Sequence, residues 1–171
     1  MRRVVVTGMG MVSSLGVGVK NNWDGILASR SGIRKIESFD VSDLPAKIGG
    51  QVPIGPTEDG LFHADDWVTP KDRRRMDDFI VYGLTAAEQA VKDSGWVCDT
   101  DEDAWRTGVL IGSGIGGLSE IAGGAITVEE GRARRLSPFF IPASLINLVS
   151  GHVSIRNGFK GPNHAVVTAC S

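Results

Sequence analysis

The chain ends in Gly161-Pro162-Asn163-His164-Ala165-Val166-Val167-Thr168-Ala169-Cys170-Ser171. The apolar run from Ala165 to Val167 predicts a short strand, and the Gly-Pro pair marks the turn before it. Small residues after a strand permit a sharp turn that lifts one side chain out of the sheet. A thiol at that position, where a following helix begins, favours the reactive thiolate. We therefore expect Cys170 to be a nucleophile, and the chain to be the first half of an enzyme. The alternative is a free structural cysteine near a terminus.

Apolar runs alternate with helical patterns along the rest of the chain. Strands are expected at Val4 to Val6 and at Val109 to Ile111, and each runs into glycines. Apolar residues at helical spacing predict helices over 20–29, 71–94, 118–130 and 143–156. The segment from Ser38 to Thr69 is expected to be irregular, with one short strand around Ile48 to Val52. Because strands apolar on both faces alternate with helices, the sequence predicts an α/β fold with a largely parallel, covered sheet.

The expected helices also have expected core faces. In the first helix, Trp23, Ile26 and Leu27 stand at helical spacing, and in the last helix the residues predicted to face inward are Leu145, Leu148, Val149 and Val153.

Composition excludes several classes of protein. A formal net charge of −2 gives no general attraction to nucleic acid or to an anionic membrane. No stretch approaches the roughly 18 apolar residues of a membrane helix, and no secretory leader is apparent, so we expect a cytoplasmic protein.

The cysteines Cys98 and Cys170 do not make a disulfide framework. The histidines His63, His152 and His164 have no metal-ligand spacing, so they are expected to be structural and no metal is expected.

A glycine-rich stretch, Gly112-Ser113-Gly114-Ile115-Gly116-Gly117, follows the second expected strand. Its glycines fit the spacing of a dinucleotide-binding loop. The acidic residue that such a site needs further along has no convincing candidate, because Glu129 and Glu130 fall in an expected helix. A tight strand-to-helix turn with close packing is therefore favoured over nucleotide binding.

Basic residues gather at two places in this slightly acidic chain. Lys71, Arg73, Arg74 and Arg75 open the long expected helix, and Arg132, Arg134 and Arg135 precede Ser137-Pro138. Each cluster could be a solvated surface or a docking site for an anionic partner, and the sequence leaves both open.

With these motifs in place, the chain resembles the β-ketoacyl-acyl-carrier-protein synthases of type II, which are condensing enzymes of fatty acid synthesis. The resemblance runs from end to end and its motifs occur in order. They are residues 2–10 (Arg-Arg-Val-Val-Val-Thr-Gly-Met-Gly), 74–79 (Arg-Arg-Met-Asp-Asp-Phe), the glycine-rich stretch, 137–142 (Ser-Pro-Phe-Phe-Ile-Pro) and 168–171 (Thr-Ala-Cys-Ser).

The resemblance implies a thiolase-like αβαβα fold built from two similar halves, with residues 1–171 as the N-terminal half and the C-terminal half absent. It implies acyl transfer from carrier-bound phosphopantetheine to Cys170, then decarboxylative condensation with malonyl-acyl-carrier protein, with no further cofactor. Ile115 would line the acyl pocket, and a homodimer is expected for the intact enzyme. The residues implied to dock acyl carrier protein are Lys71, Arg74, Arg75, Arg134 and Arg135.

One departure from the family is large. The catalytic histidines and the lysine of the family lie beyond residue 171, so this portion alone is expected to be inactive. The alternatives are a polyketide-type ketosynthase, and a non-catalytic fragment that binds carrier protein or completes a sheet with a second chain.

Overall fold

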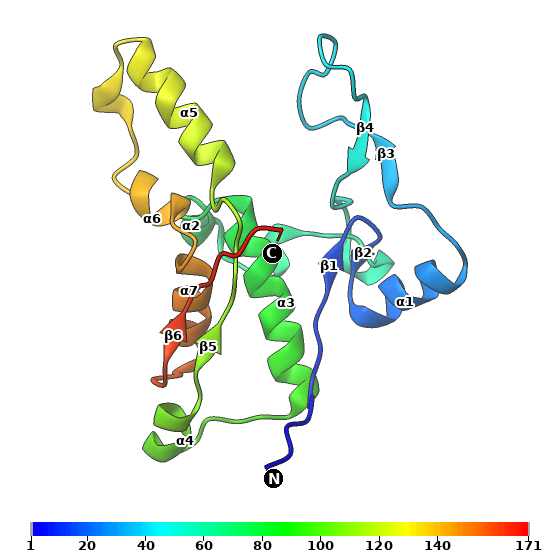
Figure 1. Cartoon of the computed structure of the whole chain (residues 1–171), viewed down its shortest axis with the longest axis vertical. Helices are drawn as coiled ribbons and strands as arrows, with labels where there is room; N and C mark the ends of the chain where they lie inside the picture. The colour runs from blue at the N-terminus through cyan, green and yellow to red at the C-terminus, as the bar shows by residue number, and fades with distance from the viewer. Residues whose placement is uncertain (1, 171) are drawn as a thin grey trace. The chain divides into compact units, whose positions relative to one another are not determined.

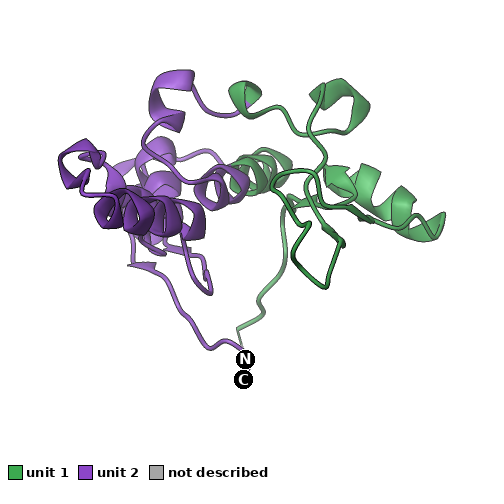
Figure 2. Cartoon of the chain, turned by 90° about the horizontal axis from the view of Figure 1, so that it is seen from above, with its two compact units in different colours: residues 1–66, 85–95 green, residues 67–84, 96–171 purple. Residues whose placement is uncertain are grey.

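The computed structural model describes residues 2–170, and Met1 and Ser171 lie outside the described residues. The chain divides into two compact units, coloured green and purple in Figure 2. Unit 1 holds residues up to 66 together with 85–95, and unit 2 holds 67–84 together with residues from 96 onward. Helix α3 (Asp78–Ser94) therefore contributes its first turns to unit 2 and the remainder to unit 1.

Unit 1 consists of short strands, one further helix and irregular chain. Its elements are β1 (Val12–Ser13), β2 (Gly16–Val17), α1 (Val19–Leu27), β3 (Ile33–Lys35), β4 (Ile48–Gly50) and the 3-10 turns η1 (Thr57–Asp59) and η2 (Ala64–Asp66). β1 pairs with β2 and β3 pairs with β4, both antiparallel, with Ile33 opposite Gly50 in the second pair. The short strand expected near Ile48 is therefore confirmed as β4.

The helix expected at residues 20–29 is present as α1, but its apolar residues do not form a buried face. Trp23, Ile26 and Leu27 are 58%, 54% and 68% exposed, whereas Asn22 is 1% exposed. The Asn22 amide donates to the carbonyls of Gly16 at 3.1 Å and Gly18 at 2.8 Å. The inner face of this helix meets the carbonyls of Gly16 in β2 and of Gly18 at the helix N-cap, so it needs a hydrogen-bond donor rather than an apolar side chain.

The strand expected at Val4 to Val6 is also absent from the described residues. Val4 is 96% exposed and Val6 is 81% exposed. The chain that follows runs beside α3, where a Cβ built on Gly8 would lie 2.2 Å from the Ala90 carbonyl oxygen. An apolar run forms a strand only beside another strand, and within the described residues none pairs with this one.

Unit 2 contains most of the helical structure, and its helices are labelled in Figure 1. Besides the start of α3, its elements are α2 (Pro70–Arg73), α4 (Asp101–Arg106), β5 (Val109–Leu110), α5 (Leu118–Glu129), the 3-10 turn η3 (Ala133–Arg135), α6 (Phe140–Ser144), α7 (Leu148–Asn157) and β6 (Asn163–His164). β5 and β6 are parallel, with Val109 opposite Asn163. The core of the unit lies where α3 meets α7 and includes Ile80, Val81, Leu84, Val149 and Val153, all at most 3% exposed.

Two expected helices are each divided in the structure. The helix predicted over 71–94 becomes α2 and α3, separated by residues 74–77. The helix predicted over 143–156 becomes α6 and α7, so Val149 and Val153 are buried as expected while Leu145 is 45% exposed. Helix α4 was not predicted, although Thr100 and Asp103 form a capping box at its start.

The last expected strand is displaced toward the N-terminus. The structure pairs Asn163–His164 rather than Ala165 to Val167, and the ladder ends where the Ile111 amide donates to the His164 carbonyl at 3.2 Å. The two chains stay close beyond that point, because a Cβ on Gly112 would lie 2.7 Å from the Val166 carbonyl oxygen. Within the described residues, three two-stranded pairs therefore replace the single covered sheet that was expected.

Candidate active site

Cys170 is an exposed free thiol at the end of the described residues, in a turn after the β6 segment. The residue before it, Ala169, has a backbone φ of 49°, which is sparsely populated for a residue with a Cβ. Strained backbone of this kind is concentrated at functional sites, where it fixes the direction of a side chain. The sharp turn that the sequence predicted before Cys170 is therefore present.

Within residues 2–170, the three histidines lie in three different environments. His63 Nδ1 lies 3.4 Å from an Asp66 carboxylate oxygen in unit 1. In α7, burial lowers the pKa of His152, and the nearby Asp72 carboxylate opposes this shift. His164 is exposed on β6. No cluster of metal-binding side chains occurs in this part of the chain.

The glycine-rich stretch forms a tight connection from β5 to α5. The Gly116 amide donates to Ser113 Oγ at 3.2 Å, and the Gly117 amide donates to the Ser144 carbonyl at 3.0 Å. Gly116 has a φ of 83°, and a Cβ there would lie 2.3 Å from the Ser144 carbonyl oxygen. Ile115 is 64% exposed at the tip of this turn. The predicted tight turn with close packing is therefore confirmed.

Asp77 is a residue of this site that the sequence analysis missed. Its side chain is 8% exposed, and Oδ2 accepts a hydrogen bond from the Glu120 amide at 3.1 Å in the first turn of α5. An aspartate before α3 is a recognisable capping signal for that helix. Its contact with a second helix joins residues 43 positions apart, so local sequence could not reveal it.

Both basic clusters lie in unit 2, where an aromatic contact connects them. Lys71, Arg74, Arg134 and Arg135 are exposed. Arg75 is partly buried, and its guanidinium carbon lies 4.6 Å from the centre of the Phe139 ring, a cation–π contact. Phe139 follows the second cluster closely, so Arg75 links the connection between α2 and α3 to the segment after η3.

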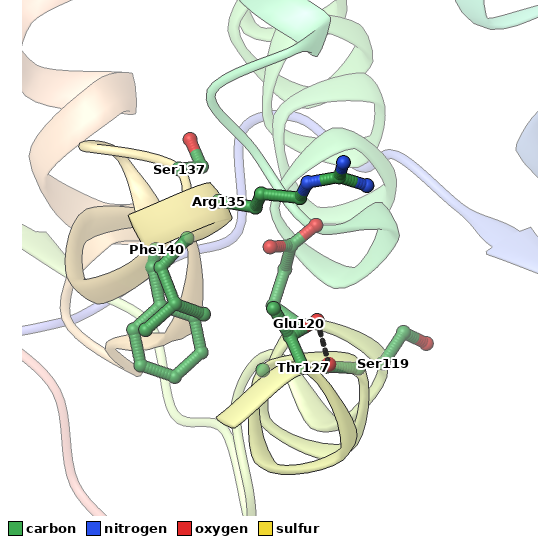
Figure 3. A pocket seen from close by; sticks show the side chains of 9 residues that line it. Ser119, Glu120, Thr127, Arg135, Ser137 and Phe140 are labelled. Carbon is green, nitrogen blue, oxygen red and sulfur yellow. Dashed lines mark hydrogen bonds between the residues drawn. The ribbon is translucent and has the colours of Figure 1, made fainter. Parts of the chain in front are cut away.

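A pocket of about 260 Å³ lies between α5 and the segment from Arg135 to Phe140 (Figure 3). Ser119, Glu120 and Arg135 give it polar lining, and the Phe140 ring gives it an aromatic wall. A Cβ on Gly124 would lie 2.4 Å from Phe140 Cε2, so only a glycine at this position of α5 admits the ring.

Among the described helices, none combines the length and apolar character needed to cross a bilayer.

Comparison with known proteins gives consistent matches over the whole chain. The family model described as "Beta-ketoacyl synthase, N-terminal domain" matches residues 1–171. The chain is 54% identical to 3-oxoacyl-[acyl-carrier-protein] synthase 2 of Rhizobium meliloti (strain 1021), over 100% of this chain and 41% of that protein. It is 45% identical to the synthase 2 of Vibrio harveyi, over 99% of this chain and 39% of that protein.

Solved structures agree in fold. The ishigamide ketosynthase/chain length factor superposes with a TM-score of 0.76 at 29% identity, over 99% of this chain and 41% of that one. The expected fold class, α/β and thiolase-like, is confirmed, and the chain spans about two fifths of the length of the relatives that it matches.

Proposed function

We propose, from the premise that the chain belongs to the β-ketoacyl synthase family through its N-terminal domain, that the intact protein is a 3-oxoacyl-[acyl-carrier-protein] synthase of fatty acid synthesis. The observation that carries this proposal is 54% identity to such a synthase along all 171 residues. Residues 1–171 would be the N-terminal half of the thiolase-like fold. This portion alone would be inactive, because the family's catalytic histidines and lysine lie beyond it.

Cys170 is the acyl acceptor in this proposal. Its thiolate attacks the thioester carbonyl of an acyl group carried on phosphopantetheine, and the carrier protein leaves as a free thiol. Malonyl-acyl-carrier protein then loses carbon dioxide, and the resulting carbanion attacks the acyl-enzyme carbonyl. The new carbon–carbon bond releases Cys170 as a thiolate and leaves the product on the carrier protein. The turn at Ala169 supports this role, because strained backbone of this kind fixes the direction of the side chain that follows it.

The partner proposed for the basic clusters is acyl carrier protein. The exposed cations Lys71, Arg74, Arg134 and Arg135 would attract an acidic partner, and Arg75 of the first cluster stacks on Phe139, close to the second cluster in sequence. Ile115 would line the acyl pocket, and phosphopantetheine on the carrier would be the only prosthetic group. We further propose a cytoplasmic homodimer for the intact enzyme.

A polyketide-type ketosynthase is the second candidate, favoured by the structural match to the ishigamide ketosynthase/chain length factor. The two functions differ in the acyl group that is extended. The intact protein should convert saturated acyl-carrier proteins and malonyl-carrier protein into 3-oxoacyl-carrier proteins, with release of carbon dioxide, as read by mass spectrometry. Extension of poly-β-keto chains but not of saturated chains would favour the second candidate, and no condensation with either would contradict both.

A further inference from the structure

Asp77 lies between the starts of two helices and interacts with both. Its Oδ2 accepts from the Glu120 amide of α5 at 3.1 Å, and its Oδ1 lies 3.4 Å from the Phe79 amide nitrogen of α3 as a long hydrogen bond. The side chain is only 8% exposed. A buried carboxylate is costly unless it is compensated, and two helix N-termini supply both amide donors and favourable dipoles.

Helix α5 depends on this residue because it has no side-chain cap of its own. The first amides of any helix lack intrahelical partners and need an acceptor. The residue at the N-cap position of α5 is Gly117, which makes no side-chain hydrogen bond. Asp77 supplies the missing acceptor to Glu120, which is the third residue of the helix.

The same contact fixes the end of the glycine-rich turn. Gly117 is buried, and a Cβ built there would lie 3.0 Å from the Asp77 Cβ and 2.6 Å from the Ala143 carbonyl oxygen. The turn therefore enters α5 between Asp77 on one side and the α6 backbone on the other. Ile115 lies two residues before Gly117. Its position therefore depends on how Asp77 and the α6 backbone hold Gly117 in place.

We propose that Asp77 is a positioning residue that sets the acyl chain-length preference, by capping α5 and thereby holding the turn that carries Ile115. The proposal rests on the proposed function, in which Ile115 lines the acyl pocket. Asp77 itself need not touch the substrate. Its loss would let the turn move, and long acyl groups would suffer because they extend furthest into the space that Ile115 borders.

The test compares acylation of Cys170 by butanoyl and tetradecanoyl pantetheine thioesters in variants of the intact enzyme. In Asp77→Ala, we expect the ratio of the long-chain to the short-chain rate to fall about fivefold, the factor by which loss of one helix cap shifts an equilibrium. Asp103→Ala is the matched control, because Asp103 accepts from the Thr100 amide in the capping box of α4. Its chain-length ratio should stay unchanged, while both variants lower the melting temperature by about 2 °C.

Two further variants also test the positioning role of Asp77. Asp77→Asn retains one oxygen acceptor and tests the role if the alanine variant does not fold, with a smaller shift in the same direction expected. Combining Asp77→Ala with Ile115→Phe should give a non-additive effect on the ratio, because both changes act through the same turn.

Failure of the positioning role can be told apart from failure of the proposed pocket. If Ile115→Phe shifts the ratio while Asp77→Ala and Asp77→Asn behave like Asp103→Ala, the positioning role is overturned and the pocket stands. If Ile115→Phe reduces both thioesters equally, Ile115 does not border the acyl group. The proposal falls in that case as well, whichever effect the Asp77 variants have.

Discussion

Arg74 and Arg75 are neighbours in the sequence, yet they have different surroundings. Arg74 is exposed, whereas the partly buried Arg75 stacks on Phe139. A stacked guanidinium keeps its edge available for a carboxylate while its face is held by the ring. Of these two members of the proposed docking surface, Arg74 is exposed and Arg75 has a guanidinium whose position is held by the Phe139 ring.

Reversing the charge of both residues tests the docking surface. The double change Arg74→Glu and Arg75→Glu should raise the KM for acyl-carrier protein about fivefold or more at low salt, because it replaces attraction by repulsion. Acylation from a small pantetheine thioester should be nearly unaffected, since that substrate needs no protein docking. Added salt should shrink the difference.

Lys35→Glu provides the control, because Lys35 is an exposed cation on β3 outside both clusters. An equal loss with the pantetheine thioester would show that the Arg75 stack matters only for folding. Indifference of the carrier-protein reaction would show that these arginines form only a solvated surface.

At the scale of elements, the close approach of α3 and α7 determines the core of unit 2. A Cβ built on Gly83 of α3 would lie 2.4 Å from Val149 Cγ1, and Val149 is 2% exposed. A side chain at position 83 would therefore force the two helices apart.

Two glycine substitutions compare this contact with an open site. Gly83→Ala should destabilise the protein by about 1–3 kcal/mol through overpacking. Gly151→Ala, in the interior of α7 with no atom near the new methyl group, should stabilise it by about 0.5–1 kcal/mol. Chemical unfolding gives both values, and a Gly83→Ala protein as stable as the parent would contradict the packing described here.

The partial burial of His152 on α7 predicts a pH dependence of stability. Burial lowers the pKa of His152 from its ordinary value of 6.5, so the unfolded chain binds this proton more readily than the folded protein does. Stability is therefore retained above about pH 6.5 and falls as the pH decreases from there toward the folded pKa. His152→Gln should remove that part of the slope in unfolding curves measured at successive pH values, and an unchanged slope would assign it to other groups.

Local signals predicted some of these elements and could not predict others. Helix α5 lies at Leu118–Glu129 where 118–130 was predicted, because its apolar residues and flanking glycines are local features. The break at residues 74–77 ends at Asp77, whose carboxylate accepts from the Glu120 amide, a contact between distant positions that no local pattern encodes. The same limit applies to α1, whose inner face contacts the carbonyls of Gly16 and Gly18 rather than an apolar core.

At the scale of the whole molecule, the family assignment and the fold class were predictable from motifs, whereas the paired strands were not. The apolar composition of the runs at Val4 to Val6 and at Val166 to Val167 predicts strands. Composition does not determine which other segment, if any, pairs with them. In the described residues these runs are largely exposed and outside any strand pair. The tight glycine turn and the turn before Cys170 were predicted better than the strands, because backbone geometry constrains these residues locally.

The central claim is that Cys170 accepts the acyl group, and the second free cysteine of the chain makes a direct test possible. Cys98 is partly buried in the connection from α3 to α4, while Cys170 is exposed after the strained Ala169. The intact protein should be incubated with acyl-carrier protein, digested, and mapped by mass spectrometry. The account predicts the acyl group on Cys170 alone, with Cys98 unmodified and condensation lost in Cys170→Ala. An acyl group on any other residue, or condensation that survives Cys170→Ala, would contradict it.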